Sequence, residues 1–390
     1  MISVSEALAH CLALAPLLPV AQVPLREAAN RWLIEPAQAR RDQPPFDASA
    51  MDGYALKGDP PPGAAFTVIG EAGAGHAFDG TLSPGQALRI FTGAPVPAGA
   101  TRVVIQEDVA RIGDTITIKP GADIANHIRP RGQDFGASFA LAPRRLRPAD
   151  LGLLAAMNLA HVPLRRRPVV AILPTGDELV QPGEMPRADQ IPSSNGVMLA
   201  AIAEAEGAQV RLLPIARDRL DEMQALLTMA LDADLIVTLG GASVGDHDLV
   251  AKAAEGLGLQ RNFWKIAMRP GKPLMAGRMG QTVLLGLPGN PVSAFVCAHL
   301  LLRPMLRAMQ GDPDPAPMPL RASLGADIGE TGPRTHYMRA KLTGTPPVIT
   351  PFPRQDSALL TVLAEADALL IRPQGDGPRK AGDAVDYLPL

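Results

Sequence analysis

The sequence is poor in several features that mark large classes of protein. Its 390 residues include only two cysteines, Cys11 and Cys297, which excludes a disulfide framework or a cysteine-based zinc site and predicts a reducing cytosol. The formal net charge is −2 and basic runs such as 165–167 have no interleaved aromatic residues, so no nucleic-acid partner is expected. No apolar run reaches the roughly 20 residues that cross a bilayer. No Lys or Arg precedes Arg26, unlike in a secretory signal, and we expect a cytoplasmic protein without a membrane partner.

Several catalytic signatures are absent too. The chain has no Walker A lysine loop, no G-x-G-x-x-G, no recognisable Ser-His-Asp arrangement and no paired Cys/His metal ligands. With 47% apolar residues, a chain of this length has enough material for roughly two to four domains. Because the net charge is close to zero, any anionic ligand must be held by local positive charge.

The chain is organised around residues 233–248, which read ADLIVTLGGASVGDHD. The apolar run from Asp234 to Leu239 has the length of a strand that is buried on both faces. Two glycines, a hydroxyl and two carboxylates follow it: Gly240, Gly241, Ser243, Asp246 and Asp248. This composition predicts a binding loop at the carboxyl end of a sheet strand, where open α/β sheets bind ligands. A tight turn with Asp246 as a helix cap is the simpler alternative.

From Pro168 onward the pattern alternates between strand and helix. Strands are predicted at 169–173, 209–213, 234–239, 263–267, 274–277 and 283–287, and helices at 193–206, 219–231, 249–257 and 292–309. Such spacing predicts a doubly wound, mostly parallel sheet. Loops 175–178, 240–248 and 287–293 each follow a strand and carry polar or kinked residues. We therefore expect the three loops to meet in one crevice.

The first part of the chain predicts helices and a β-rich module. Ser3 and Glu6 have the spacing of a capping box, so a helix is expected to begin there, with a second helix near 25–32. Residues 44–56 form an irregular loop with two carboxylates, which either fold onto their own backbone or face a ligand. Short β-branched runs between 65 and 139 indicate a small all-β module.

Two loops of this module and the end of the chain complete the prediction. Loop 92–97 has an exposed hydroxyl, and loop 129–134 brings two guanidinium groups near an acid, as suits a phosphate or a salt bridge between chains. A helix is predicted at 149–157. After the proline-rich segment 312–319, further short strands suggest a last β domain.

Four carboxylates crowd the predicted crevice: Asp177, Glu178, Asp246 and Asp248. They would repel one another unless a cation such as Mg²⁺, which prefers oxygen ligands, lay among them. That cation would attract phosphate, while helix N-termini supply N–H donors and Arg269 and Lys272 supply positive charge. The residues alone therefore predict a Mg²⁺-dependent site for a phosphorylated or adenylylated small molecule, whose identity stays open.

Eight motifs in a fixed order carry a resemblance to a known family. They are SAMDGYA, RIFTGAPVP, IRPRGQDF, PTGDEL, SSN, GGASVGDHD, RPGKP and LPGNPVSAF. In this order they resemble the MoeA family of molybdopterin molybdenumtransferases, relatives of gephyrin's C-terminal part. The resemblance implies an enzyme that hydrolyses adenylylated molybdopterin with Mg²⁺ and inserts molybdate into the dithiolene, releasing AMP.

The resemblance also implies an architecture. It would comprise a discontinuous linking and dimerisation domain at 1–45 and 141–167, a small β domain at 46–140, a MoaB/MogA-like α/β domain at 168–312 and a C-terminal β domain at 313–390. The chain would form a homodimer whose active cleft lies between the sheet domain of one subunit and the small β domain of the other. Molybdopterin adenylyltransferase and proteins that handle the finished cofactor would be its further partners.

The resemblance assigns roles residue by residue. The catalytic residues would be Asp52, Asp134, Asp177, Glu178, Asp246 and Asp248, and the last four of these would hold Mg²⁺. Nucleotide and pterin would contact Thr92, Arg129, Thr175, Gly176, Ser194, Asp218, Gly240, Gly241, Ser243, Gly245, Pro288, Gly289, Asn290 and Pro291. Molybdate would lie among Ser243, Arg269, Lys272, Pro273, Arg339 and Ser357. Asp52, Thr92, Arg129 and Asp134 would reach in from the partner chain. Arg269 stands where many members have lysine, which keeps the charge and changes the donor geometry.

Two rival functions remain at this point. A CinA-like nucleotide hydrolase would share the sheet domain and cleave its substrate without molybdate. However, a protein that borrowed only this domain would not bring SAMDGYA and TGAPVP. A non-enzymatic scaffold would keep the dimer and cluster a partner protein, and the retained acidic loops argue against it.

Overall fold

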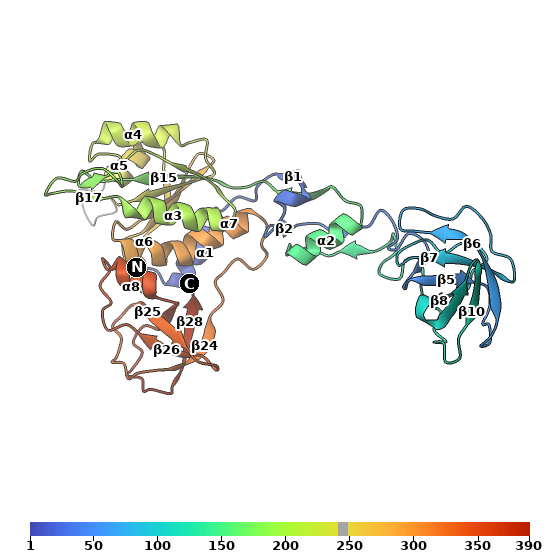
Figure 1. Cartoon of the computed structure of the whole chain (residues 1–390). Coiled ribbons are helices and arrows are strands. Elements are labelled where there is room, and N and C mark those ends of the chain that lie inside the picture. Colours follow the sequence, from blue (N-terminus) through green and yellow to red (C-terminus); the bar gives the residue numbers. More distant parts are fainter. Residues whose placement is uncertain (241–248) are drawn as a thin grey trace. The chain divides into compact units, whose positions relative to one another are not determined.

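The structure is a computed structural model that describes residues 1–240 and 249–390 (Figure 1). The predictions for Gly241, Ser243, Gly245, Asp246 and Asp248 lie outside the described residues. The chain forms two compact units: unit 1 is Met1–Ala21 with Leu164–Leu390, and unit 2 is Gln22–Pro163. The expected linking segment 1–45 is therefore divided between the two units, and the finer four-domain boundaries stay a prediction.

A six-stranded sheet forms the centre of unit 1. Its order is β18 (Gln209–Leu212), β15 (Val169–Pro174), β19 (Leu235–Leu239), β23 (Thr282–Leu287), β22 (Met275–Met279) and β20 (Gln260–Trp264). The first four strands are parallel and the last two are antiparallel. The predicted mostly parallel sheet is thus confirmed. All five residues of β19 are buried, as expected for a strand covered on both faces.

Helices cover both faces of this sheet, which makes it doubly wound (Figure 1). One face packs against α3 (Ser194–Ala205) and a continuous helix built from α6 (Pro291–Cys297), the π turn η3 (Ala298–Leu302) and α7 (Arg303–Met309). The other face packs against α4 (Leu220–Met229) and α5 (Leu249–Gly256). Within the described residues, Pro291–Met309 is long and apolar enough to cross a membrane, but 78% of its most apolar window is buried inside the protein, as in a core helix.

The first helix, α1 (Val4–Leu14), belongs to the core of unit 1. The capping box is present: Ser3 Oγ accepts the Glu6 N–H at 3.1 Å, and the Ser3 N–H donates to Glu6 Oε2 at 2.7 Å. Ala7 and Cys11 on the buried side of α1 lie in the same hydrophobic cluster as the sheet and α7. The Leu18 N–H donates to the carbonyl of Met309 at 3.1 Å and fixes the end of this segment.

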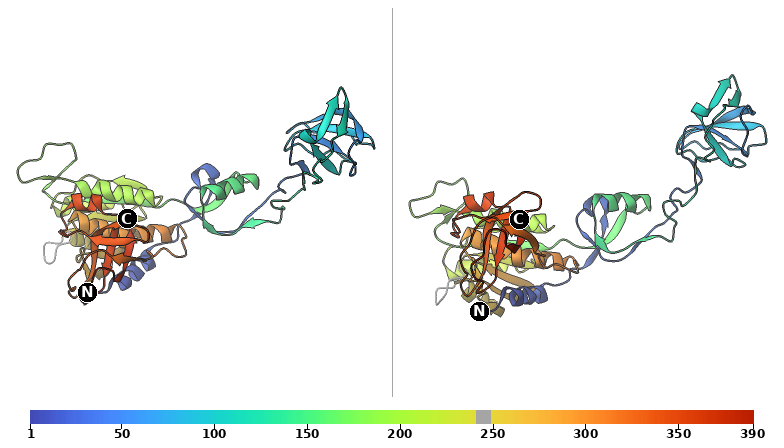
Figure 2. Two further views of the ribbon diagram at one scale, coloured as in Figure 1. Left: turned by 60° about the horizontal axis from the view of Figure 1, so that its bottom comes forward. Right: turned by 90° about the horizontal axis from the view of Figure 1, so that it is seen from below.

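A second six-stranded sheet completes unit 1, and both chain ends lie in this unit (Figure 2). Its order is β21 (Met268–Arg269), β25 (Thr335–Thr343), β26 (Val348–Pro351), β24 (Leu320–Leu324), β28 (Ala384–Pro389) and β27 (Ala368–Arg372), with α8 (Leu360–Glu365) beside it. The predicted short strands near the end of the chain are therefore confirmed. Tyr337, Leu369 and Leu388 join the core of the first sheet, so the two sheets of unit 1 pack together.

Unit 2 contains the predicted all-β module. Its sheet order is β8 (Arg102–Ile105), β5 (Gly53–Leu56), β7 (Gln86–Ile90), β6 (Ala65–Ala72), β10 (Thr115–Ile118) and β9 (Val109–Ile112). Beside the 3₁₀ turn η1 (Leu25–Glu27) lies α2 (Pro148–Ala156), close to the predicted 149–157. A four-stranded sheet has the order β1 (Val20–Pro24), β14 (His161–Arg165), β2 (Trp32–Leu33) and β13 (Arg144–Arg145). Short pairs add β3 (Ala37–Gln38) with β12 (Ala140–Leu141), and β4 (Ala48–Ser49) with β11 (Ile128–Arg129).

The helix predicted near 25–32 is wrong. Only Leu25–Glu27 forms a short 3₁₀ turn, and Trp32–Leu33 is a strand. Asn30 between them has φ of 62°, a left-handed conformation that an α-helix cannot contain, and its N–H donates to the Leu146 carbonyl. Pairing with a distant segment thus overrides the local helical pattern.

Candidate functional site

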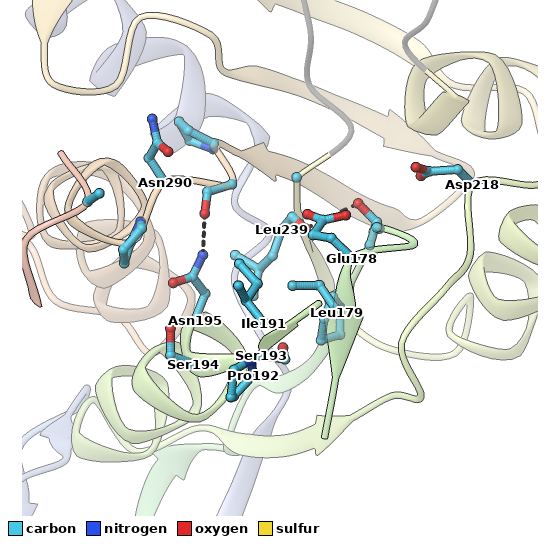
Figure 3. A pocket seen from close by; sticks show the side chains of 18 of the residues that line it. Glu178, Leu179, Ile191, Pro192, Ser193, Ser194, Asn195, Asp218, Leu239 and Asn290 are labelled. Carbon is cyan, nitrogen blue, oxygen red and sulfur yellow. Dashed lines mark hydrogen bonds between the residues drawn. The ribbon is translucent and has the colours of Figure 1, made fainter. Parts of the chain in front are cut away.

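Residues that follow β15, β19 and β23 line one pocket of about 1160 Å³ (Figure 3), and of the loop 240–248 only Gly240 belongs to the described residues. It lies at the carboxyl ends of three adjacent parallel strands, the usual ligand position in an open α/β sheet. Its lining includes Thr175, Gly176 and Glu178 from the first loop, Gly240 from the second, and Pro288 to Pro291 from the third. The first loop, the third loop and the start of the second are therefore brought together, and the rest of the second loop lies outside the described residues.

The first loop places one carboxylate over a glycine. Gly176 has φ of 142°, and a Cβ added there would lie 2.3 Å from Glu178 Oε2. The absence of a side chain at Gly176 therefore makes the room that the Glu178 carboxylate occupies. Thr175 is 3% exposed and its Oγ1 donates to the Leu239 carbonyl at 3.1 Å, so this hydroxyl joins the ends of β15 and β19.

Asp177 and Asp218 have different positions relative to the pocket. Asp218 and Glu178 line it, and Figure 3 shows both side chains on the same side of the view. Asp177 is not among the lining residues, and its Oδ1 accepts the Asp218 N–H at 3.1 Å. Arg217 donates to the carbonyls of Asp177 and Leu179 at 3.1 and 3.0 Å. Asp177 therefore holds the segment that carries Asp218.

Glycine backbone and helix starts complete the lining of the pocket. Gly240 has φ of 94°, and a Cβ there would lie 2.9 Å from the Thr175 carbonyl oxygen. Asn195 Nδ2 donates to the Gly289 carbonyl at 2.6 Å, while its buried Oδ1 has no partner in the described chain. Helices α3 and α6 begin at this wall, with Ser194 and Asn290 at their starts. N–H groups at helix N-termini favour anionic groups such as phosphate.

The C-terminal sheet region contributes a loop to the same pocket. Asn290 Nδ2 donates to Ser357 Oγ at 3.1 Å, and the Val292 N–H donates to the Ser357 carbonyl at 3.1 Å. Ala358 and Leu360 follow and line the pocket. Ser357 is therefore attached to the start of α6, next to the loop 287–291.

Arg339 of β25 stabilises this loop by hydrogen bonds to its backbone. Its side chain is only 1% exposed, with Nη1 donating to the Leu359 carbonyl at 3.2 Å and Nη2 to the Arg354 carbonyl at 3.4 Å. Gln355 Oε1 accepts the Arg339 N–H at 3.0 Å. The guanidinium expected to contact molybdate is thus engaged by the backbone on both sides of Ser357.

Arg269 and Lys272 are exposed, and Pro273 lines the pocket. Neither basic side chain forms an ion pair with a carboxylate in residues 1–240 and 249–390. Of the expected molybdate residues, the structure therefore brings Pro273 and the Ser357 loop to the pocket. Arg269 and Lys272 are not among the residues that line it.

Four of the expected site residues, Asp52, Thr92, Arg129 and Asp134, belong to unit 2. Asp52 Oδ1 accepts both the N–H and the hydroxyl of Thr92, each at 2.7 Å. These two hydrogen bonds lower the pKa of Asp52, with a smaller contribution from Arg89. Arg129 and Asp134 are exposed. In loop 129–134 it is Arg131 that forms an ion pair, with Asp42 at 2.6 Å.

Some lining residues were missed by the sequence analysis. Asn195 lies in the SSN motif, in which only Ser194 was assigned a role. An amide side chain that follows two hydroxyl residues at a helix start could have indicated it. Lys252 also lines the pocket, from the first turn of α5. Ile191 and Leu360 supply apolar surface, and nothing local in the sequence distinguishes them from other apolar residues.

Three family models match the chain in order. They are the MoeA N-terminal region (domain I and II) at residues 2–158, a probable molybdopterin binding domain at 171–308, and the MoeA C-terminal region (domain IV) at 321–390. The middle match covers the sheet and helices that build the pocket. The fold and the pocket therefore define a multidomain protein built around a sheet domain of the molybdopterin-binding class.

Whole-chain relatives make this more specific. The chain is 38% identical over 367 residues to molybdopterin molybdenumtransferase 2 of Mycobacterium tuberculosis, covering 90% of each chain. It is 30% identical over 398 residues to the molybdopterin molybdenumtransferase of Staphylococcus aureus, covering 99% of this chain and 95% of the relative. A crystal structure of the molybdopterin biosynthesis MoeA protein from Pyrococcus horikosii matches with a TM-score of 0.83 and 28% identity, over 100% of this chain and 99% of that one. The chain belongs to the MoeA family of molybdopterin molybdenumtransferases.

Proposed function

We propose that this protein inserts molybdenum into molybdopterin by hydrolysing adenylylated molybdopterin in the presence of Mg²⁺, with release of AMP. The observation that supports the proposal best is the composition of the pocket in unit 1. It combines carboxylates on one wall with the backbone of Gly289 and the N-terminus of α3 on the other, in a space of about 1160 Å³. A phosphoanhydride needs both kinds of wall, because its oxygens bind a cation and N–H donors together.

The described carboxylates fit Mg²⁺. Mg²⁺ is commonly bound by one or two carboxylates together with substrate phosphates and water. Glu178 and Asp218 line the pocket and supply two, although no three His, Cys, Asp or Glu side chains cluster in the described chain. When bound, Mg²⁺ would neutralise charge that develops on the phosphoanhydride. Asp177 would keep the Asp218 segment in place, and Asp246 and Asp248 remain proposed ligands outside the described residues.

The other residues of the pocket would bind and orient the substrates. Asn195 Oδ1, which has no hydrogen-bond partner in residues 1–240 and 249–390, would accept a hydrogen bond from a ligand N–H, while its Nδ2 donates to the Gly289 carbonyl. Ser194 and Asn290, at the starts of α3 and α6, would lie near the phosphates. Molybdate would bind beside Ser357, Lys272 and Arg269, since a tetrahedral dianion is held by several cations and hydroxyl donors.

The first test is a single assay on the purified protein. Adenylylated molybdopterin, Mg²⁺ and molybdate are supplied, and AMP release and transfer of active cofactor to an apo-molybdoenzyme are followed. We expect both products, and both should depend on molybdate. AMP release without need of any oxyanion would favour the nucleotide hydrolase, and ligand binding without any product would favour the scaffold.

Two variants assign the two halves of the site. Glu178→Gln should lower AMP release by about 10²-fold or more while leaving molybdate binding in place, because it removes a charged group at the phosphoanhydride. Lys272→Ala should weaken molybdate binding first. Glu184→Gln is the matched control, because Glu184 is an exposed acid that does not line the pocket. Equal loss of both functions in both variants would contradict this division of labour.

We further propose a cytoplasmic homodimer in which Asp52, Thr92, Arg129 and Asp134 of one subunit complete the pocket of the other. Inactive Asp52→Asn and Glu178→Gln proteins can be unfolded together and refolded as a mixture. If the site is shared, each mixed dimer has one unaltered site, and about a quarter of the wild-type activity should return. No recovery, with mixed dimers demonstrated, would place the whole site in one chain. Molybdopterin adenylyltransferase would supply the substrate, and downstream cofactor-handling proteins would receive the product.

A further inference from the structure

The loop 270–273 packs directly against helix α6. Gly271 in this loop is buried, and Cys297 Sγ donates to its carbonyl at 3.8 Å. A Cβ added at Gly271 would lie 2.5 Å from Cys297 Sγ, closer than Cβ atoms approach other atoms in real proteins. The thiol therefore occupies the space in which a side chain at residue 271 would lie.

Both partners of this contact belong to segments that reach the pocket of unit 1. Pro273, at the end of the loop, lines the pocket, and so does Pro291, the first residue of α6. Cys297 is the last residue of α6 and lies roughly 9 Å along the helix from Pro291, at about 1.5 Å per residue. The contact between Gly271 and Cys297 therefore fixes the loop relative to the helix that begins at the pocket.

A backbone hydrogen bond attaches the next residue of the loop. The Ile266 N–H donates to the Lys272 carbonyl at 3.1 Å, while the side chain of Lys272 is exposed. Lys272 follows Gly271 directly, so a displacement of the Gly271 backbone moves the backbone of Lys272 as well. The position of this cation thus depends on how closely Gly271 approaches α6.

Cys297 suits this contact because its side chain is short and stays neutral. It is 0% exposed, and burial raises the pKa of its thiol well above the usual range, with a smaller contribution from Cys11. A neutral S–H is a weak donor to a carbonyl, and a buried cysteine packs as a small apolar side chain. The thiol can therefore lie against the Gly271 backbone without placing a charge in the core.

We propose that Gly271 is a positioning residue of the oxyanion site, and that its contact with Cys297 sets where Lys272 presents its charge to a tetrahedral dianion. This inference rests on the molybdate site proposed above and adds to it the contact that holds its loop. Neither Gly271 nor Cys297 touches the anion. Because charge-assisted hydrogen bonds depend on geometry, a change at this contact should alter the Kd for molybdate while every charge of the site is retained.

The first test is calorimetric titration of the full-length protein with sodium molybdate. Gly271→Ala should raise the Kd about tenfold, because the new Cβ pushes the loop away from α6. Adding Cys297→Ala removes the atom with which that Cβ collides, so the double variant should regain about threefold in affinity. The strain of alanine at φ of 105° remains in both variants and does not account for the recovery. A double variant that binds no better than Gly271→Ala would overturn the inference.

The two cysteines provide a matched comparison that does not depend on the folding of Gly271→Ala. Cys297→Ala alone should raise the Kd about threefold, because the loop loses its contact with α6. Cys11 is also 0% exposed and lies in the same hydrophobic cluster. Cys11→Ala should therefore lose a similar free energy of unfolding in urea and keep the wild-type Kd.

The outcomes separate this inference from the proposed function. An equal Kd in Cys297→Ala, Cys11→Ala and wild type would overturn the positioning role and leave the proposed function intact. Failure of wild type to bind molybdate at millimolar concentration would instead overturn the proposed oxyanion site together with the inference.

Discussion

A methyl group added at Gly176 tests whether activity depends on the position of the Glu178 carboxylate. In Gly176→Ala the new Cβ would lie 2.3 Å from Glu178 Oε2, where ordinary contacts begin at 3.4 Å, so the carboxylate must move by about 1 Å. A displacement of that size at a reacting group can cost about 10²-fold in rate. The residue also keeps φ of 142°, a strained conformation for alanine that costs roughly 1–3 kcal/mol of folding stability.

Gly183 provides the control for backbone strain. It has φ of 97°, and a Cβ added there would contact nothing within 4 Å. Gly183→Ala should therefore lose a comparable free energy of unfolding, measured by urea denaturation, while the pocket is unchanged. AMP release should fall by about 10²-fold in Gly176→Ala alone. If the two variants differ by less than about threefold in AMP release at similar stability, the rate does not depend on the position of the Glu178 carboxylate, and the reasoning is refuted.

Three further predictions concern the rest of unit 1. Asn290→Ala and Ser357→Ala should each raise KM for molybdate, and the double variant should be no worse than either, because the residues share one hydrogen bond; additive losses would show independent roles. Arg339→Lys should cost roughly 1–3 kcal/mol in urea unfolding and raise KM for molybdate, since it removes donors from two loop carbonyls; unchanged stability would contradict this support. Burial, followed by Arg303, lowers the pKa of His299 from 6.5 to about 4, so stability should fall by up to about 3 kcal/mol as the pH drops through that interval. His299→Gln should flatten this decline, and an unaltered pH profile would refute it.

The parts of the fold that follow from local chemistry could be predicted from the sequence. The apolar run 234–239 and the short β-branched runs predict strands from the local sequence alone. Runs of this length and composition favour a buried strand whichever strands they pair with. The Ser3–Glu6 capping box likewise predicts a helix start by its spacing alone. The crevice followed from combining these elements, since the carboxyl ends of parallel strands lie at one edge.

Features that depend on distant segments could not be predicted. Asn30 adopts a left-handed conformation because its N–H meets the Leu146 carbonyl, more than a hundred residues away, and this ends the expected helix. The resemblance assigned Arg339 to molybdate, but it did not show that the loop 352–359 packs against Arg339 and accepts hydrogen bonds from its guanidinium. The contact between Gly271 and Cys297 joins the loop 270–273 to α6, and no periodicity in the sequence shows it.

The divided origin of unit 1 has a consequence for the order in which the chain folds. Unit 2 is one continuous segment, Gln22–Pro163, whereas unit 1 needs Met1–Ala21 together with everything after Leu164. During synthesis α1 emerges before unit 2, yet the sheet and helix that cover Ala7 and Cys11 are made only after unit 2, and the carbonyl that receives the Leu18 N–H belongs to Met309. Unit 2 can fold in the meantime, because domains generally fold as units as they leave the ribosome. Residues 1–21 are therefore made before unit 2 and reach their final places after it, and their removal would damage the sheet domain rather than their neighbours in sequence.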